Sequence, residues 1–226
     1  LSLVGSEMCI RDRDSTDYFT AWVHQIKTPL SVMRLQLQSE DTPENRAMLA
    51  ELFQMEQYVT MALSYARLGN PTKDLVLTRV PLDPVIRQAI RDFAPLLIRK
   101  KLRLQYEPTA ESALTDSKWL LFILHQLLSN AVKYTERGRV SIRVTSAPAI
   151  IVADTGIGIA PEDVPRVFEK GYTGYNGRGG QKSTGLGLYL VHQTAEMLHC
   201  RVSLSSRIGE GTSVTIDLHQ EELGKE

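Results

Sequence analysis

The sequence predicts an α+β protein in which an antiparallel helical hairpin precedes an α/β sandwich. Apolar positions recur at helical spacing over residues 14–68, whereas strand-like and helical patterns are mixed from residue 71 onward. The second part shows no strict βαβ repeat, which favours a sandwich over a doubly wound sheet. We therefore expect a hairpin at 14–70, a linker at 71–78 and a larger domain at 79–226.

Two apolar series predict the hairpin. Steps of 3, 4, 4, 3 and 4 residues connect Phe19, Trp22, Ile26, Leu30, Met33 and Leu37. Steps of 4, 3, 4, 3 and 4 residues connect Met48, Leu52, Met55, Val59, Ala62 and Ala66. Between them, Asp41 or Thr42 can cap a helix and Pro43 suits its first turn. Because one hairpin buries too little on its own, we expect two chains to form a four-helix bundle, which makes the protein a homodimer.

The second domain is predicted from shorter segments. We expect strands at 75–80, 102–106, 140–145, 150–153, 202–205 and 212–218, and helices at 83–100, 116–134 and 183–198. Gly69 and Pro71 end the second hairpin helix before this region begins.

The composition excludes several classes of partner and location. Lys and Arg number 26, as do Asp and Glu, so no charge excess points to nucleic acid. Two cysteines are too few for a disulfide framework. The longest apolar run, residues 119–124, is far shorter than the roughly 20 residues of a membrane span. We expect the chain to be a fragment with any membrane anchor upstream, and residues 1–13 to be non-native or disordered.

Three segments are predicted to build a nucleotide site, and the first two are rich in glycine. Asp154 directly follows a predicted strand, where its carboxylate can accept a hydrogen bond from an exocyclic amine. Gly156 and Gly158 let the backbone approach a flat ring. The second segment, Ser183-Thr-Gly-Leu-Gly-Leu, leads into a helix whose free N–H groups can hold phosphate oxygens.

The third segment is Asn130-Ala-Val-Lys-Tyr on a predicted helix. Asn130, Lys133 and Tyr134 are three and four residues apart and therefore share one face. An amide oxygen there can bind Mg²⁺, and an ammonium group can neutralise phosphate. Each segment alone is a weak signal, and their order along the chain makes the prediction specific.

These segments resemble the N, G1, F and G2 boxes of the histidine-kinase catalytic domain, part of the GHKL ATP-binding superfamily. The resemblance rests on HQLLSNAVKYT, ADTGIGIAPED, VFEKGYTG and STGLGLYLV and covers about residues 79–218. It implies a GHKL-type sandwich that binds ATP and Mg²⁺. By this resemblance, Asp154 recognises adenine and Asn130 binds Mg²⁺, while Lys133 and Tyr134 line the phosphate and ribose region.

The same resemblance implies a mobile lid at residues 172–182, whose glycines also favour mobility. Arg178 in that lid could reach the γ-phosphate, or it could be a solvated loop charge. Gln126 stands where the family usually has the first Asn of the N box, so we do not assign it a contact with metal or phosphate. The further residues expected to contact the nucleotide are Thr173, Thr184, Gly185, Leu186 and Gly187.

His24 is the predicted phospho-acceptor. It groups with a polar face, made of Lys27, Thr28, Ser31 and Gln38, rather than with the apolar series, which argues against a buried core histidine. Pro29 removes one helical hydrogen bond and is expected to bend the helix one turn after His24. A neutral imidazole is a competent nucleophile near pH 7 and can accept a phosphoryl group.

The hairpin resembles the dimerisation and histidine phosphotransfer domain of sensor kinases. In that family an acidic residue usually follows the acceptor histidine and is proposed as a general base. Gln25 cannot take a proton, so either another group orients the imidazole or base catalysis is not required. Thr28 matches the position implicated in dephosphorylating the regulator, or it merely stabilises the helix before proline.

The motif His-Gln-Ile-Lys-Thr-Pro more closely resembles intramembrane-sensing kinases that work with ABC transporters in bacitracin and antimicrobial-peptide resistance. The resemblance therefore implies ATP-dependent autophosphorylation on His24 and phosphotransfer to an aspartate of a response regulator receiver domain. The expected signal is a peptide antibiotic or cell-envelope stress. The expected location is the cytoplasmic portion of a bacterial inner-membrane protein, with an ABC transporter as a further partner.

Two alternatives remain open. A GHKL ATPase that drives a conformational clamp would need a glutamate near the N box, and Glu136 lies on the wrong side of Tyr134. A dimeric scaffold that binds ATP without phosphotransfer is kept open by Gln25 and Gln126. Structural or solvent-exposed roles are expected for the remaining histidines, because they lack metal-ligand spacing; these are His125, His192, His199 and His219.

Overall fold

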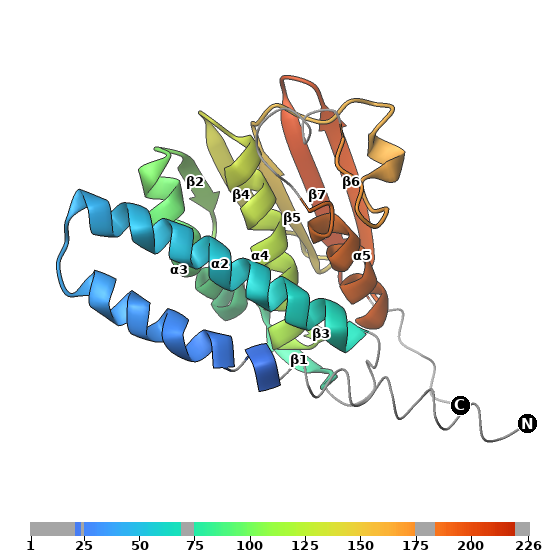
Figure 1. Ribbon diagram of the computed structural model, residues 1–226. Helices are drawn as coiled ribbons and strands as arrows, with labels where there is room; N and C mark the ends of the chain where they lie inside the picture. The colour runs from blue at the N-terminus through green and yellow to red at the C-terminus, as the bar shows by residue number, and fades with distance from the viewer. Residues whose placement is uncertain (1–20, 24, 69–74, 175–183, 220–226) are drawn as a thin grey trace, which may run out of the picture. The chain divides into compact units, whose positions relative to one another are not determined.

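The computed structural model describes residues 21–23, 25–68, 75–174 and 184–219. Contacts divide the chain into two compact units, Leu1–Lys73 and Asp74–Glu226. The first is a helical hairpin and the second mixes helices with a sheet (Figure 1), which confirms the predicted α+β class. The domain boundaries stay a prediction, because residues 69–74 lie outside the described part of the chain.

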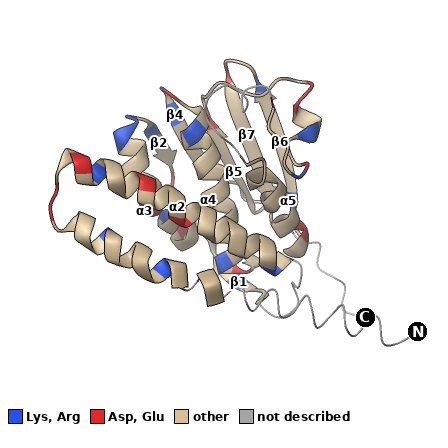
Figure 2. Cartoon of the chain, viewed as in Figure 1, with Lys and Arg blue, Asp and Glu red and all other residues tan. Residues whose placement is uncertain are grey.

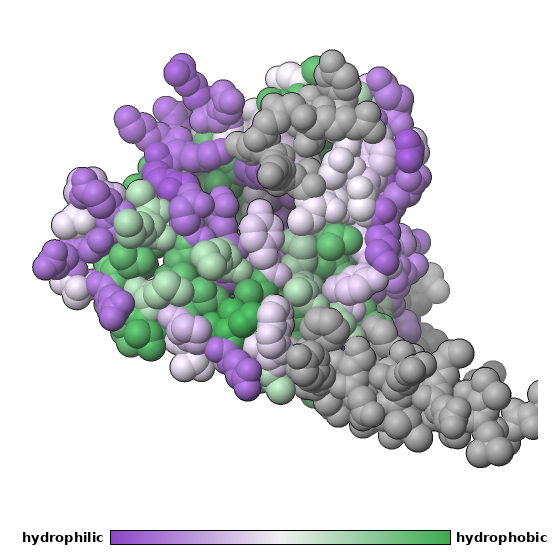
Figure 3. All heavy atoms as spheres, viewed as in Figure 1, coloured by the Kyte–Doolittle hydropathy of each residue, from purple (hydrophilic) through white to green (hydrophobic). Residues whose placement is uncertain are grey.

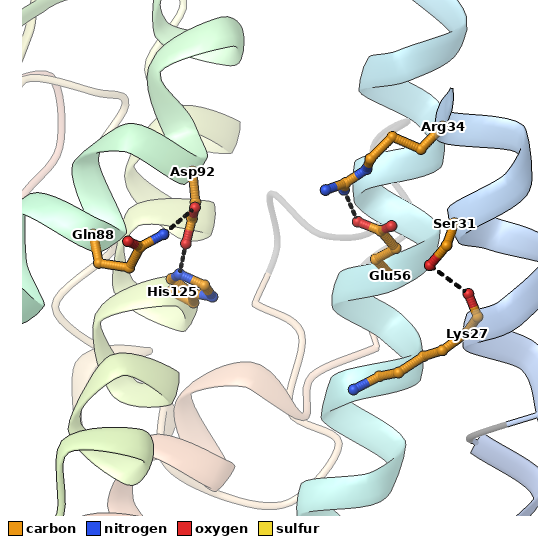
Figure 4. Close-up of polar contacts among 7 residues, drawn as sticks. All are labelled: Lys27, Ser31, Arg34, Glu56, Gln88, Asp92 and His125. Atoms are coloured by element: carbon orange, nitrogen blue, oxygen red, sulfur yellow. Dashed lines mark hydrogen bonds and ion pairs between the residues drawn. The ribbon is translucent and has the colours of Figure 1, made fainter. Parts of the chain in front are cut away.

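The hairpin pairs two antiparallel helices. Residues 25–38 are helical, so the first helix continues through Pro29, and α2 runs from Pro43 to Leu68. The hydroxyl of Thr42 accepts a hydrogen bond from the N–H of Asn45 at 3.1 Å, which caps α2 as predicted. Arg34 forms an ion pair with Glu56 between the two helices (Figure 4).

The predicted apolar series of the hairpin is only partly covered in a single chain. Leu30 and Leu52 are buried. In contrast, Trp22, Met33, Met48 and Met55 each expose 40–57% of their surface, and Figure 3 shows apolar side chains gathered over the hairpin. These four side chains are available to a second chain, in keeping with the predicted four-helix bundle.

The second unit is built on a five-stranded sheet with the strand order β2-β4-β5-β7-β6. β2 and β4 are parallel, and the other neighbouring strands are antiparallel. The strands are β2 (Arg103–Tyr106), β4 (Arg139–Val144), β5 (Ala149–Asp154), β6 (Arg201–Arg207) and β7 (Gly211–Asp217). Every one of these strands was predicted from the sequence with slightly different ends.

Three helices cover one face of this sheet (Figure 1). They are α3 (Leu82–Arg99), α4 (Ser117–Tyr134) and α5 (Gly187–Met197). The core between the layers contains Val140, Ile142, Ile150, Val152, Val214 and Ile216 from the sheet. Burial of such apolar surface is the main stabilising contribution to a two-layer domain. Lys and Arg residues alternate along the ribbon with Asp and Glu residues (Figure 2).

A small second sheet precedes α4. β1 (Thr78–Pro81) pairs antiparallel with β3 (Ser112–Thr115), a short strand that the sequence pattern did not predict. Asp116 caps α4 by accepting hydrogen bonds from Lys118 N–H at 2.8 Å and Trp119 N–H at 3.3 Å. Its other oxygen accepts one from Val76 N–H at 2.9 Å, which fixes the start of this unit to α4. A short 3₁₀ helix follows later at Val164–Arg166.

α3 and α5 end in the same way. Lys101 and His199 adopt left-handed backbone conformations with φ of 55° and 56°. After α3, the N–H of Leu102 bonds to the carbonyl of Leu97 at 2.9 Å. After α5, the N–H of Cys200 bonds to the carbonyl of Ala195 at 2.8 Å. Both are Schellman motifs, in which glycine is the favoured residue at the left-handed position.

Replacing Lys101 or His199 by Gly is therefore expected to stabilise the protein by roughly 1 kcal/mol, because a left-handed non-glycine residue is strained by about that amount. Each variant should raise the melting temperature by about 2–4 °C in a thermal unfolding scan. Arg99→Gly, within the last turn of α3, is the control and should destabilise instead. A lower melting temperature for Lys101→Gly and His199→Gly would contradict the assignment of these two helix ends as Schellman motifs.

Candidate nucleotide and phosphotransfer site

The first and third predicted segments meet at the end of β5. The N–H of Gly156 donates to Oδ1 of Asp154 at 2.8 Å. The N–H of Ile157 donates to the carbonyl of Tyr134, the last residue of α4, at 3.2 Å. A Cβ added at Gly156 would lie 2.4 Å from that carbonyl oxygen, so only glycine permits this approach. Residues 154–158, which we call the Asp154 turn, are thus held against the end of α4 by backbone contacts.

The start of α5 lies against the same helix. A Cβ at Gly187 would be 3.3 Å from Oε1 of Gln126 and 3.9 Å from the side-chain amide atoms of Asn130. The N-terminus of α5, with its free N–H groups, therefore meets two amide side chains of α4. An amide oxygen beside a helix N-terminus suits a metal ion bound to phosphate, so Asn130 fits the predicted role in holding Mg²⁺.

The β6–β7 hairpin supports the other side of the Asp154 turn. Gly158 has a φ of +72°, and a Cβ there would lie 2.0 Å from the carbonyl oxygen of Arg207. The N–H of Gly209 donates to the carbonyl of Ile157 at 2.9 Å. A Cβ at Gly211 would lie 1.9 Å from the carbonyl oxygen of Asp154. The hairpin and the turn are in backbone contact, which fixes where the Asp154 carboxylate can point.

Burial raises the pKa of the Asp154 carboxyl, while hydrogen bonds from the backbone of Gly156 and Thr212 lower it. The buried hydroxyl of Thr135 also faces this carboxyl, without the geometry of a full hydrogen bond. Desolvation is the larger effect, so the ionised carboxylate is less favourable here than in water. A hydrogen-bond donor on a bound ligand would favour the ionised form.

Lys133 supplies a cation on the same helix. Its Nζ lies 5.3 Å from the centroid of the Tyr134 ring, and burial lowers the pKa of its ammonium group. Charge in a partly desolvated position acts more strongly on a neighbouring anion than charge in water. This placement fits the predicted role of Lys133 beside phosphate.

The two ends of the glycine-rich segment lie together. The N–H of Gly171 donates to the carbonyl of Gly185 at 3.0 Å, and Gly185 has a φ of +65°. Thr173 and Leu186 are half-buried near these ends, and Thr184 is exposed. Residues 175–183, which include Arg178, lie outside the described residues, so the lid at 172–182 stays a prediction. α5 begins at Gly187 rather than at Ser183, because residues 184–186 form a turn.

On the hairpin, His24 lies outside the described residues, and its role as acceptor stays a prediction. Gln25, Lys27 and Thr28 are exposed, as expected for the polar face. The hydroxyl of Ser31 donates to the carbonyl of Lys27 at 2.9 Å (Figure 4). This hydrogen bond satisfies the Ser31 hydroxyl within the helix.

His125 on α4 has a structural role, as expected. Its Nε2 lies 2.9 Å from Oδ2 of Asp92 on α3, and Gln88 donates to the other oxygen of Asp92 at 2.8 Å (Figure 4). The Phe93 ring packs edge-on against the imidazole at a centroid distance of 5.6 Å. This group of side chains fixes the packing of α3 on α4.

Burial lowers the pKa of His125, although Asp92 raises it in part. Because the folded protein favours the neutral imidazole, the unfolded chain binds the proton first as the pH falls. We therefore expect the free energy of unfolding to decrease below pH about 6.5, the usual histidine pKa. When the pH is lowered from 7.5 to 5.5, the melting temperature of His125→Gln should fall less than that of the parent protein. His219→Gln, at an exposed position, is the control, and an equal pH dependence of His125→Gln and the parent protein would contradict the expectation.

Comparison with protein families identifies this unit. Residues 115–222 match the family of histidine kinase-, DNA gyrase B-, and HSP90-like ATPases. The second unit is therefore similar to a histidine-kinase-type ATPase domain. The match includes α4, the Asp154 turn and the start of α5, and so contains all three predicted segments. The predicted GHKL-type fold is thereby confirmed.

Sequence relatives extend the similarity to the hairpin. The sensor protein BceS of Halalkalibacterium halodurans is 37% identical over 209 residues, which cover 91% of this chain and 63% of the relative. BceS of Bacillus subtilis is 35% identical, with coverage of 88% and 61%. The sensor protein kinase GraS of Staphylococcus aureus strain MRSA252 is 33% identical, with coverage of 87% and 58%. The predicted resemblance to sensor histidine kinases is confirmed, and the chain spans about three-fifths of the length of these relatives.

Solved structures of histidine kinases share the fold. Full-length ShkA in complex with AMPPNP has a TM-score of 0.61 and 26% identity, covering 88% of this chain and 45% of that chain. The Acinetobacter baumannii histidine kinase AdeS has a TM-score of 0.59 and 22% identity, covering 87% and 97%. Within the described part of this chain, no helix is both long and apolar enough to cross a membrane.

Proposed function

We propose that the chain is a protein histidine kinase that transfers the γ-phosphoryl group of ATP to His24 and then to an aspartate of a response regulator. One observation carries this proposal: Asp154, Asn130 and the first turn of α5 converge within the ATPase domain. The similarity to sensor histidine kinases supports it, as does the ShkA complex with the ATP analogue AMPPNP.

Different residues of the chain bind different parts of the nucleotide. The Asp154 carboxylate accepts a hydrogen bond from the exocyclic amine of adenine, and Gly156 and Gly158 keep the turn close to the ring. The N–H groups at the start of α5 hold phosphate oxygens, and Lys133 adds positive charge. Asn130 would hold Mg²⁺, which neutralises charge on the transferred phosphoryl group.

At the acceptor, a ring nitrogen of His24 forms a bond to the γ-phosphorus while the bond to the bridging oxygen breaks and ADP leaves. Gln25 cannot accept a proton, so the imidazole N–H proton is released to water. In a second transfer, a carboxylate oxygen of a receiver-domain aspartate bonds to the phosphorus while the N–P bond to His24 breaks, and the imidazole takes up a proton from water. Thr28 lies one turn after His24 and is exposed, which supports a role in hydrolysis of that regulator phosphate.

Incubation with γ-³²P-ATP and Mg²⁺ tests the proposal. The expected result is acid-labile, alkali-stable label on the protein that is lost in His24→Ala. Free phosphate without labelled protein would overturn the kinase proposal in favour of a GHKL ATPase. Nucleotide binding without label or hydrolysis would overturn it in favour of a scaffold.

We propose a homodimer formed through the hairpins, because Trp22, Met33, Met48 and Met55 are exposed there. Mixed dimers of His24→Ala and Asp154→Asn chains separate two routes of transfer. Label on the Asp154→Asn chain means that phosphate crosses between chains, whereas the absence of label means that it stays within one chain. A monomer in light-scattering measurements would overturn the dimer.

We also propose that this protein acts as the cytoplasmic part of a membrane sensor for peptide antibiotics or cell-envelope stress, with an ABC transporter as partner. The motif His-Gln-Ile-Lys-Thr-Pro and the similarity to BceS and GraS support this assignment. Expression of a response-regulator target gene should rise on exposure to bacitracin in cells that carry the gene of this protein. No rise in those cells would overturn the assignment.

A further inference from the structure

The end of α4 is fixed by one side chain of α3. The Nζ of Lys100 donates to the carbonyl oxygens of Val132 at 2.6 Å, Lys133 at 3.2 Å and Thr135 at 3.2 Å. An ammonium group has three donors, and all three are used here. The sequence pattern gave no indication of this contact beyond a Lys at the end of a predicted helix.

These carbonyls are the ones that a helix leaves without internal partners at its C-terminus. The fourth, that of Tyr134, accepts the N–H of Ile157 from the Asp154 turn at 3.2 Å. Lys100 and the Asp154 turn therefore together donate hydrogen bonds to all four of these carbonyl groups. A cation at this position also interacts favourably with the negative end of the helix dipole.

The last turn of α4, whose carbonyl groups accept hydrogen bonds from Lys100, belongs to the candidate nucleotide site. Lys133 and Tyr134 lie in it, and Asn130 lies one turn earlier on the same helix. Gly156 packs on the Tyr134 carbonyl so closely that a Cβ would lie 2.4 Å away. A displacement of the last turn of α4 would therefore move both the side-chain amide of Asn130, which faces α5, and the turn that carries Asp154.

We propose that Lys100 is a positioning residue for the nucleotide site, an inference that rests on the proposed function. Its ammonium group holds the C-terminal turn of α4 so that Asn130, Lys133 and Asp154 keep their relative places. Lys100 is half-buried and acts through main-chain atoms. Burial lowers the pKa of its ammonium group and Glu136 raises it.

A residue that only stabilised the fold would lower the melting temperature and leave the affinity of the folded protein unchanged. The test therefore compares Lys100→Met, Lys100→Arg and the control Arg99→Met in the full chain. Arg99 is an exposed cation adjacent to Lys100 in sequence. Circular dichroism selects a temperature at which each variant is folded, and calorimetry then measures binding of Mg²⁺–AMPPNP.

We expect Lys100→Met to weaken Mg²⁺–AMPPNP binding by about 10-fold or more, in the range seen when residues that orient ligands are removed. Lys100→Arg should keep most of the affinity, and Arg99→Met all of it. Without nucleotide, hydrogen exchange at the Ile157 amide should be faster in Lys100→Met, because Lys100 no longer holds the helix turn that carries the Tyr134 carbonyl.

A folded Lys100→Met protein with the parent affinity and the parent Ile157 exchange rate would overturn the positioning role and leave the proposed function intact. Failure of the parent protein itself to bind Mg²⁺–AMPPNP would overturn the proposed function instead. If Lys100→Met does not fold, Lys100→Leu, which also removes the donor group, takes its place under the same criteria.

Discussion

Asp154→Asn is expected to weaken nucleotide binding strongly and thereby to abolish phosphorylation of His24. The substitution replaces a carboxylate oxygen by an N–H₂ group, which faces the adenine amine as a second donor. Losing a hydrogen bond to a charged group and leaving two donors opposed costs about 3 kcal/mol, or about 100-fold in affinity. Calorimetric titration with Mg²⁺–AMPPNP measures the affinity, and γ-³²P labelling measures the transfer.

The variant should remain folded, so that the loss reflects binding. Because burial raises the pKa of Asp154, the ionised carboxylate above that pKa lowers the stability of the nucleotide-free protein, and Asn removes this charge. Asp217→Asn is the matched control, since Asp217 lies at the opposite end of the β5–β7 pair and contacts Arg201. Affinity within about threefold of the parent value for Asp154→Asn would refute the adenine assignment.

Gly158→Ala is expected to destabilise the ATPase domain by about 3 kcal/mol and to weaken nucleotide binding as well. A left-handed alanine costs roughly 1 kcal/mol. The added methyl group would also lie 2.0 Å from the carbonyl oxygen of Arg207 and 2.5 Å from its carbon, and overpacking of this kind typically costs about 1–3 kcal/mol. Relief of the clash would move the Asp154 turn away from β6 and β7. Urea denaturation gives the change in the free energy of unfolding.

Gly209→Ala separates the two contributions. Gly209 has a similar φ of +78°, but no atom lies within 4 Å of a Cβ placed there. This variant should lose only the backbone contribution of roughly 1 kcal/mol and should keep the affinity for nucleotide. Equal destabilisation by the two substitutions would show that the contact between Gly158 and Arg207 does not constrain the turn.

Much of the fold could be predicted from the sequence because its helices carry strong local signals. α3, α4 and the hairpin helix α2 begin and end within about two residues of the predicted positions, since apolar spacing, Asp116 and Thr42 mark them. β3 was missed because its four residues are defined by pairing with β1, about 30 residues earlier, which is a tertiary contact. The start of α5 was placed too early, because Gly185 turns the chain before the helix begins.

The candidate site was predictable where its chemistry lies in side chains and not where it lies in backbone contacts. The carboxylate of Asp154 and the amide of Asn130 could be proposed as ligands from the sequence, and the structure brings both into the same region of the domain. The burial of Gln126 against Gly187 and the contacts of Lys100 depend on how α3, α4 and α5 pack, which no local pattern encodes. The roles of the individual site residues and of His24 remain predictions for the experiments above.

The contacts of Gly158 and Gly211 with the last two strands have a consequence for protein synthesis. Asn130 and Asp154 leave the ribosome well before β6 and β7, yet the backbone that holds Asp154 is complete only when Gly211 has docked on it. A nascent chain that ends before β7 therefore has the candidate ligand residues without the backbone contacts that hold Asp154. If the chain binds ATP as proposed, we expect only finished domains to bind it.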